Sequence, residues 1–368
     1  MPADIHAATP LPDDVYIIDP VIHAINLEHG NVASKYGQQL YDMSYPLHTM
    51  FSPPDRICPQ GSYMRDIPAK ALVETIFTET QTALAATHTL TLDSWFHDGF
   101  CREEKTLEMT TRWPNRVLAY LGADPTRELS FTLEWLEKQA EATPNAIGIK
   151  MYPHQMNPYK HWKTNDDKVM RIIEKAQSLG LKSVGIHKAL PNGSVPLAPY
   201  KIEDDFEQAA DAFPDIAFEI IHAGMAFTEE TALAIGRFPN VYANLENTFS
   251  LLYQAPRRFE EALGLMMQWG GLEKILYSSG AIVTHPQHLL ELFWQFEFSD
   301  EALGKFGIPQ MTQDTRRAIL GGNYARMAGL DIADWKARQK GDEFEHKRSG
   351  GLAPAWSVLT GEPSGVAA

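Results

Sequence analysis

Short apolar segments alternate with longer amphipathic segments along most of this 368-residue chain. This alternation constrains the fold more than any other feature of the sequence, because it is typical of parallel strands joined by helices. We expect eight strands, at residues 15–19, 89–93, 116–121, 146–150, 182–187, 216–222, 241–246 and 274–279. The clearest helical patterns cover residues 68–87, 127–141, 166–179, 203–212, 229–237, 256–269 and 286–298.

Eight strands that alternate with helices predict an α/β fold, namely a single (β/α)8 TIM barrel. The alternative is an open doubly wound sheet, which usually carries a glycine-rich phosphate-binding turn, and neither of the two common motifs of this kind occurs. We expect residues 1–340 to form the barrel, with residues 24–66 as a long loop that caps the carboxyl ends of the strands. Residues 341–368 are rich in Gly, Pro and Ala, which predicts a C-terminal arm or a disordered tail.

Composition excludes several classes of protein. Lys and Arg total 32 against 47 for Asp and Glu, giving a net charge of −15, which argues against binding to nucleic acid. The two cysteines, Cys58 and Cys101, cannot form a disulfide framework, so a reducing compartment fits. We find neither a secretory signal pattern nor an apolar run long enough to span a membrane, and we therefore expect a cytoplasmic protein.

Residues that can bind a metal stand at the ends of five predicted strands. In the first strand the alternation of side chains puts Asp19 and His23 on one face. Four other strands finish on apolar residues and then place one polar side chain each: Lys150, His187, His222 and Glu246. The carboxyl ends of barrel strands meet at one mouth, and imidazole with carboxylate is the usual ligand mixture for zinc, iron or manganese. The pattern therefore predicts a transition-metal site, at which Lys150 is a candidate for carbamylation.

Weaker candidates for a substrate pocket follow the same strands: Asp93, His97, Tyr152, His154, Ser278 and His285. For Asp93 and His97 the alternative is a turn in which the aspartate caps a helix. For His285 the alternative is an exposed or supporting position at the start of a helix. Glu219 lies three residues before His222, so strict alternation puts the two on opposite faces, and we expect Glu219 to be a structural ion-pair partner.

These motifs resemble the amidohydrolase superfamily, specifically its amidohydrolase-related branch, over about residues 15 to 330. The resemblance rests on short motifs in a shared order: Ile17-Ile18-Asp19 with His23, Gly148-Ile149-Lys150, His187, His222-Ala223-Gly224, and the segment from Ile319 to Arg326. It implies a (β/α)8 barrel with a metal at its mouth.

The chain also departs from the pattern of that branch. The family's first strand carries Asp-x-His-x-His, and Val21 replaces the first of these histidines. Its eighth strand ends in an aspartate, and Gly280 stands at that position. Glu246 is an acid that the pattern does not require. A site that has lost two ligands and gained one carboxylate is interpreted as rewired rather than degenerate.

A rewired site of this kind resembles the dinuclear-metal oxygenases of the branch, such as its hydroxylases and binuclear-iron monooxygenases. The resemblance implies an oxygenase component with two iron or manganese ions that hydroxylates a small aliphatic substrate, with dioxygen and external electron donors such as ferredoxin and a reductase. His187, His222, His23 and Glu246 would be ligands, carbamylated Lys150 would bridge the ions, and Asp19 would be a ligand or would orient His23.

Two alternatives remain open. The first is a zinc- or manganese-dependent hydrolase or decarboxylase of the ordinary branch. The second is a non-catalytic sibling that supports a homologous barrel subunit in a homo- or hetero-oligomer.

Overall fold

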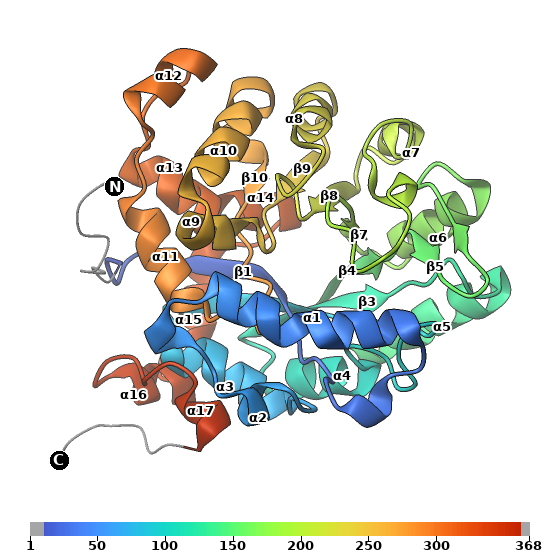
Figure 1. Ribbon diagram of the computed structural model, residues 1–368, viewed down its shortest axis with the longest axis horizontal. Helices are drawn as coiled ribbons and strands as arrows, with labels where there is room; N and C mark the ends of the chain where they lie inside the picture. Colours follow the sequence, from blue (N-terminus) through green and yellow to red (C-terminus); the bar gives the residue numbers. More distant parts are fainter. Residues whose placement is uncertain (1–10, 362–368) are drawn as a thin grey trace.

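A computed structural model describes residues 11–361 of the chain. Eight parallel strands follow one another in chain order, and Ile22 forms a parallel bridge to Ala281 that nearly closes the sheet into a barrel (Figure 1). The strands are β1 (Ile17–Ile22), β2 (Thr82–His88), β3 (Val117–Gly122), β4 (Ala146–Met151), β7 (Ser183–His187), β8 (Ala217–Ile221), β9 (Val241–Asn244) and β10 (Ile275–Leu276). The predicted single (β/α)8 barrel is therefore confirmed.

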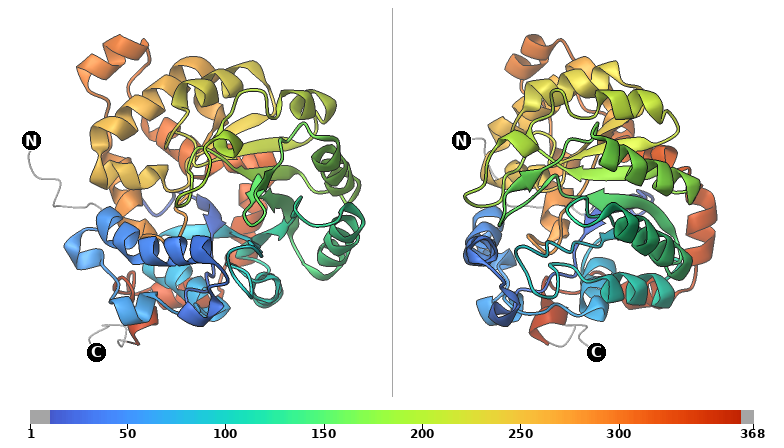
Figure 2. Two further views of the ribbon diagram at one scale, coloured as in Figure 1. Left: turned by 45° about the vertical axis from the view of Figure 1, so that its right-hand side comes forward. Right: turned by 90° about the vertical axis from the view of Figure 1, so that its right-hand side faces the viewer.

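Helices surround the strands, as the turned views also show (Figure 2). Their apolar faces follow helical spacing: α6 buries Val169, Ile172, Ile173 and Ala176 against the barrel. The helices of the ring include α3 (Ala69–Glu79), α4 (Glu103–Arg112), α5 (Leu129–Ala142), α6 (Asp167–Ser178), α7 (Glu207–Ala212), α8 (Thr228–Arg237), α9 (Leu251–Gln254), α10 (Pro256–Gly270), α11 (Pro286–Gln295), α12 (Asp300–Phe306), α13 (Gln313–Arg317), α14 (Asn323–Ala328) and α15 (Ile332–Gln339). None of the helices within residues 11–361 is long and apolar enough to cross a membrane.

The second strand lies earlier in the chain than the sequence predicts. The expected helix over 68–87 ends at Glu79, where Thr80 adopts an extended conformation, and the strand occupies Thr82–His88 rather than 89–93. Alanines at 83, 85 and 86 favour a helix by propensity. Pairing with β1 on one side and β3 on the other overrides that preference, because the segment is buried between the two strands.

The segment 24–66 is largely helical instead of an irregular loop. It contains α1 (Lys35–Phe51) and α2 (Gln60–Tyr63), and the hydroxyl of Ser34 caps the start of α1. Figure 1 shows α1 crossing in front of the strands. Its side chains contact loops that follow strands, since Gln39 accepts a hydrogen bond from the backbone of Ser194 and His48 bonds the carbonyl of Val283.

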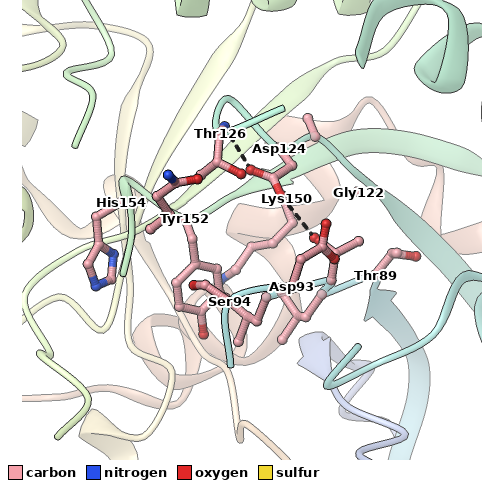
Figure 3. A pocket seen from close by; sticks show the side chains of 14 residues that line it. Thr89, Asp93, Ser94, Gly122, Asp124, Thr126, Lys150, Tyr152 and His154 are labelled. Carbon is pink, nitrogen blue, oxygen red and sulfur yellow. Dashed lines mark hydrogen bonds between the residues drawn. The ribbon is translucent and has the colours of Figure 1, made fainter. Parts of the chain in front are cut away.

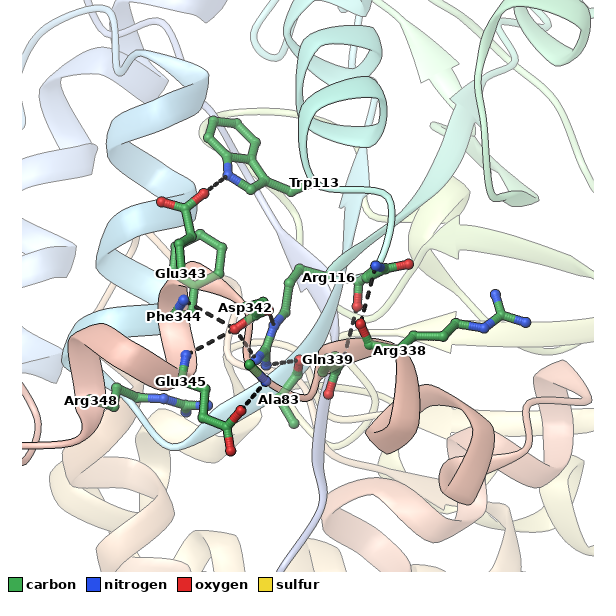
Figure 4. Close-up of polar contacts among 12 residues, drawn as sticks. Ala83, Trp113, Arg116, Arg338, Gln339, Asp342, Glu343, Phe344, Glu345 and Arg348 are labelled. Carbon is green, nitrogen blue, oxygen red and sulfur yellow. Dashed lines mark hydrogen bonds and ion pairs between the residues drawn. The ribbon is translucent and has the colours of Figure 1, made fainter.

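The C-terminal segment packs on the barrel through α16 (Glu343–Arg348) and α17 (Ser357–Thr360), so residues 341–361 are not disordered. Arg116 forms two hydrogen bonds to the carboxylate of Asp342, at 2.6 and 3.0 Å, and Trp113 donates to Glu343 (Figure 4). The arm is expected from the sequence to be mobile or to wrap a partner, but buried polar contacts within the chain hold it in place. Residues 362–368 of the predicted tail lie outside the described residues.

Candidate functional site

Four side chains from four strand ends converge on Glu246, which follows β9. Its Oε1 lies 3.0 Å from Nε2 of His23, and its Oε2 lies 3.6 Å from Nε2 of His222 and 3.9 Å from Nζ of Lys150. All four residues are buried. The sequence-based expectation that these residues meet at the barrel mouth therefore holds in the geometry.

His187 joins the cluster through a contact between two ring nitrogens. Its Nδ1 lies 3.0 Å from Nε2 of His222. The other nitrogen of each ring faces a backbone carbonyl, that of Leu190 for His187 at 2.8 Å and that of Glu246 for His222 at 3.2 Å. A carbonyl only accepts hydrogen bonds, so each neutral ring carries its hydrogen on that side. Two lone pairs therefore face each other at 3.0 Å, an arrangement that a proton or a cation between the rings would stabilise.

Burial controls the protonation of this cluster. Desolvation lowers the pKa of His222 to about 4 and also lowers the pKa of His187 and of the Lys150 ammonium. Burial acts to raise the pKa of Glu246, but the nearby charges of His222 and Lys150 outweigh it and hold that pKa well below its usual range. The site at neutral pH thus combines an ionised carboxylate with neutral imidazoles, which are the forms that bind metals.

The backbone at the ends of β8 and β9 aims these side chains. His222 has a φ of 69° and Asn247 a φ of 58°, both in the left-handed region that few residues other than glycine adopt. The backbone N–H of Glu246 donates to the side chain of Asn244 at 3.1 Å. Residues held in this conformation concentrate at functional sites.

The turn at His222 also explains why the prediction for Glu219 is wrong. Because the backbone leaves strand geometry at His222, alternation no longer separates the two residues, and Glu219 lies inside the barrel. It accepts hydrogen bonds from Tyr120, from Ser183 and from Asn244, the last at 2.8 Å, instead of forming an outward ion pair.

Asp19 lies apart from the cluster, contrary to its predicted role as a ligand or as the acceptor that orients His23. Its carboxylate accepts hydrogen bonds from the hydroxyl and backbone N–H of Ser279 and from the N–H of Val21. Burial raises the pKa of Asp19 to about 7. Asp19 therefore fixes the loop after β10 to the end of β1.

Glu246 occupies the space beside Gly280, the position at which the resemblance implies an aspartate. A Cβ atom at residue 280 would lie 2.7 Å from Oδ1 of Asn247 and 3.0 Å from Cγ of Glu246. The φ of Gly280 is +65°, which also favours glycine. The acid on β9 and the glycine after β10 thus depend on each other.

A small pocket lies beside Lys150, with a cavity volume of about 30 Å³ (Figure 3). Its lining includes three of the predicted pocket residues, Asp93, Tyr152 and His154. Tyr152 stacks on His187 with ring centroids 4.2 Å apart, which connects the pocket to the cluster. Asp93 is exposed and forms an ion pair with Arg127 at 2.6 Å.

The other three predicted pocket residues do not line it. His97 is exposed and lies on an outer surface pocket, because the turn after β2 carries it away from the mouth. Ser278 is fully buried, and within residues 11–361 its hydroxyl has no hydrogen-bond partner. His285 caps α11 and contacts Glu79 at 3.1 Å, so its role is structural.

The sequence analysis missed His88, the last residue of β2. Its Nε2 bonds the carbonyl of Pro20 at 2.8 Å, and its ring stacks on Tyr120 and meets His23 edge to face. The misplaced strand boundary hid this residue, since a strand ending at residue 88 would have added a fourth strand-end histidine.

None of the described residues form a group of three or more His, Cys, Asp or Glu side chains arranged as a ready-made metal site. The donor atoms contact one another directly, as in the pairs His23–Glu246 and His187–His222. The predicted dinuclear shell of six residues is therefore wrong in its full form, because Asp19 is bonded elsewhere.

Comparisons with known proteins are consistent with this architecture. A family model described as amidohydrolase matches residues 18–330. No curated protein matches the chain.

Several solved structures share the fold at low sequence identity. An uncharacterised TIM-barrel protein from Bordetella bronchiseptica is 12% identical with a TM-score of 0.57, covering 85% of this chain and 99% of its own. A 5-carboxyvanillate decarboxylase from Novosphingobium aromaticivorans, with bound manganese, is 10% identical with a TM-score of 0.51, covering 86% and 98%. An amidohydrolase from Burkholderia multivorans, with bound zinc, is 14% identical with a TM-score of 0.50, covering 86% and 100%.

These comparisons contradict the expected oxygenase. The similar enzymes are a decarboxylase and an amidohydrolase, so the prediction of an iron or iron–manganese oxygenase acting on an aliphatic substrate is wrong. The expected sibling subunit and electron donors stay predictions. With a family model that matches most of its length and a barrel that carries the same motifs, the chain belongs to the amidohydrolase family of enzymes.

Proposed function

We propose that this chain is a divalent-metal-dependent hydrolase or decarboxylase, with His187, His222 and Glu246 holding the ion. The observation that carries the proposal is the pair of imidazole lone pairs facing each other at 3.0 Å, with Oε2 of Glu246 3.6 Å from His222. That oxygen has no hydrogen-bond partner among the residues that the structure describes. Two imidazoles and a carboxylate, all buried and free of competing hydrogens, fit zinc or manganese.

The similar structures support the choice of metal and reaction class. The amidohydrolase from Burkholderia multivorans binds zinc, and the decarboxylase from Novosphingobium aromaticivorans binds manganese. When bound, such an ion supplies Lewis-acid polarisation of a carbonyl or carboxylate oxygen. Neither reaction class needs an external reductant.

His23 has the geometry of a proton-transfer residue. Its Nε2 donates to Oε1 of Glu246, so in the neutral ring the lone pair is on Nδ1. Within residues 11–361, Nδ1 is buried without a partner. A carboxylate that fixes the tautomer of a neighbouring imidazole is a known arrangement for a general base. His23 accepts or returns a proton at Nδ1, while Glu246 holds the ring in place.

The test is turnover with and without metal. Chelator-treated protein, reloaded with zinc or manganese, is assayed without reductant for carbon dioxide release from aromatic carboxylates and for hydrolysis of lactones and amides. We expect activity on a member of this panel that depends on added metal and is lost in His222→Ala. The control His97→Ala changes an exposed histidine outside the cluster and keeps activity. Activity that is unchanged by chelation contradicts the proposal.

A second candidate function is the non-catalytic sibling of an active barrel subunit. Val21 and Gly280 cannot bind a metal, and no complete three-residue metal group is formed within residues 11–361. This alternative is supported if the reloaded protein holds no metal, shows no turnover and co-purifies with a homologous barrel chain.

A further inference from the structure

Lys150 lies between the carboxylate of Glu246 and the pocket shown in Figure 3. Its side chain is 1% exposed, and its Nζ has no hydrogen-bond partner in the described part of the chain. Oε2 of Glu246 is 3.9 Å away, which is too far for a hydrogen bond. A buried ammonium with three unused donors is costly, so this group calls for an acceptor that the chain itself does not provide.

His154 supplies a second unused donor in the same pocket. Its Nε2 lies 3.1 Å from the hydroxyl of Tyr200. Burial raises the pKa of Tyr200, so the phenol keeps its hydrogen and donates it to Nε2. The hydrogen of the neutral imidazole is then on Nδ1, a buried atom without a partner within residues 11–361.

The acidic residues of the pocket are already satisfied. Asp124 accepts hydrogen bonds from the backbone of Thr126 at 2.8 Å and from the hydroxyl of Thr91 at 3.3 Å. Arg127 forms ion pairs with Asp93 at 2.6 Å and with Asp124 at 3.7 Å. The two groups without partners, Lys150 and His154, are therefore donors, which favours an anionic ligand.

We propose that Lys150 and His154 bind the carboxylate of the substrate in this pocket, so that the substrates are carboxylic acids. The volume of about 30 Å³ suits one carboxylate-sized group rather than a whole substrate, because one water in the liquid takes up about the same space. The inference rests on the proposed function, since it places that carboxylate beside Glu246 and the candidate ion.

In this proposal Lys150 stays an unmodified amine. A carbamate would replace the ammonium by a second anion close to Oε2 of Glu246, whereas the amine complements that charge at 3.9 Å. The predicted carbamylation of Lys150, which would bridge two ions, is thus an outcome of the test.

The experiment measures binding of benzoate and acetate, against benzamide and acetamide, to the full-length protein by calorimetry. Each is measured on protein as isolated and after chelation, because a bound ion itself attracts carboxylates. We expect the carboxylates to bind in preference to the amides in both samples. Lys150→Met should weaken carboxylate binding by about tenfold to a hundredfold, the range for a charged hydrogen bond. Lys150→Arg should retain part of it.

The matched control is Lys138→Met, which removes an exposed lysine that pairs with Glu134 and should leave binding unchanged. If Lys150→Met does not fold by circular dichroism, His154→Phe must weaken carboxylate binding while Lys150 remains in place. Equal affinity for amides and carboxylates, or no loss in these variants, overturns the inference.

Metal content, measured in the same samples, separates this inference from the proposed function. Lys150→Met should hold as much zinc or manganese as the wild type. A carbamate signal in the 13C spectrum after labelling with bicarbonate, absent in Lys150→Met, would overturn the inference and leave the metal-dependent function intact. Conversely, a wild type without metal or turnover that still binds carboxylates through Lys150 refutes only the proposed function.

Discussion

Replacing Gly280 by alanine tests whether the glycine after β10 and the acid after β9 depend on each other. The new Cβ would lie 2.7 Å from Oδ1 of Asn247 and 3.0 Å from Cγ of Glu246, closer than real Cβ contacts allow. Residue 280 also has a φ of +65°. The substitution therefore adds two costs, one conformational and one steric.

The two costs can be separated with a control glycine. Gly307 has a φ of +62° at the end of α12, and a Cβ there would have no atom within 4 Å. Gly307→Ala should cost only the left-handed conformation, about 1–2 kcal/mol. Gly280→Ala should cost that amount plus about 1–3 kcal/mol for overpacking, about 2–5 kcal/mol in total.

Urea unfolding of both variants measures these free energies, and the slope of each transition checks that the denatured state is unchanged. We also expect Gly280→Ala to weaken zinc or manganese binding, because its methyl group displaces Glu246, whereas Gly307→Ala does not. Equal destabilisation of the two variants, with unchanged metal affinity in both, would refute the packing of Glu246 against Gly280.

Three further outcomes follow from buried charges. The pKa of Asp19 is about 7 in the folded chain against 3.8 ordinarily, so the unfolded state loses this proton first, and stability falls by about 4 kcal/mol as pH rises from 4 to 7; Asp19→Asn should flatten that slope in urea unfolding at several pH values. Asp342→Asn leaves the buried Arg116 without its anion and should lower the free energy of unfolding by about 3 kcal/mol, with an unchanged midpoint contradicting the role of this pair. Glu79→Ala removes the acceptor for the backbone of α17 and should make the C-terminal arm, cleaved before the barrel, more sensitive to limited proteolysis.

The barrel itself could be predicted because the period of the apolar pattern is local information. Every strand except the second lies close to its expected position, and helix α10 begins at Pro256 as expected. The second strand could not be placed, because Ala83, Ala85 and Ala86 favour a helix and only pairing with β1 and β3 makes them extended.

The core of the site could also be predicted, because parallel strands bring their carboxyl ends together whatever the loops do. His23, Lys150, His187, His222 and Glu246 meet as expected. This convergence follows from topology alone and does not depend on side-chain detail.

Orientation of individual side chains could not be predicted. The left-handed backbone at His222 reverses the expected direction of Glu219, and no pattern in the sequence announces it. His285 has the residue type of a site residue, yet its partner Glu79 lies 206 positions away in the chain. Such contacts are set by packing between distant elements.

The reaction class also exceeded what the residues could decide. Val21 and Gly280 correctly mark a departure from the family pattern, but a missing ligand does not specify the chemistry that replaces it. The same lone-pair cluster fits redox and non-redox metals, so the similar enzymes decide against the oxygenase.

The central claim is that the lone pairs of His187 and His222 face a common cation. Anomalous scattering at the zinc and manganese edges, from crystals of the reloaded protein, tests it most directly. The account predicts a peak bonded to Nδ1 of His187, to Nε2 of His222 and to Glu246. A loaded crystal with no peak there, and a hydrogen bond between the two rings instead, would contradict it.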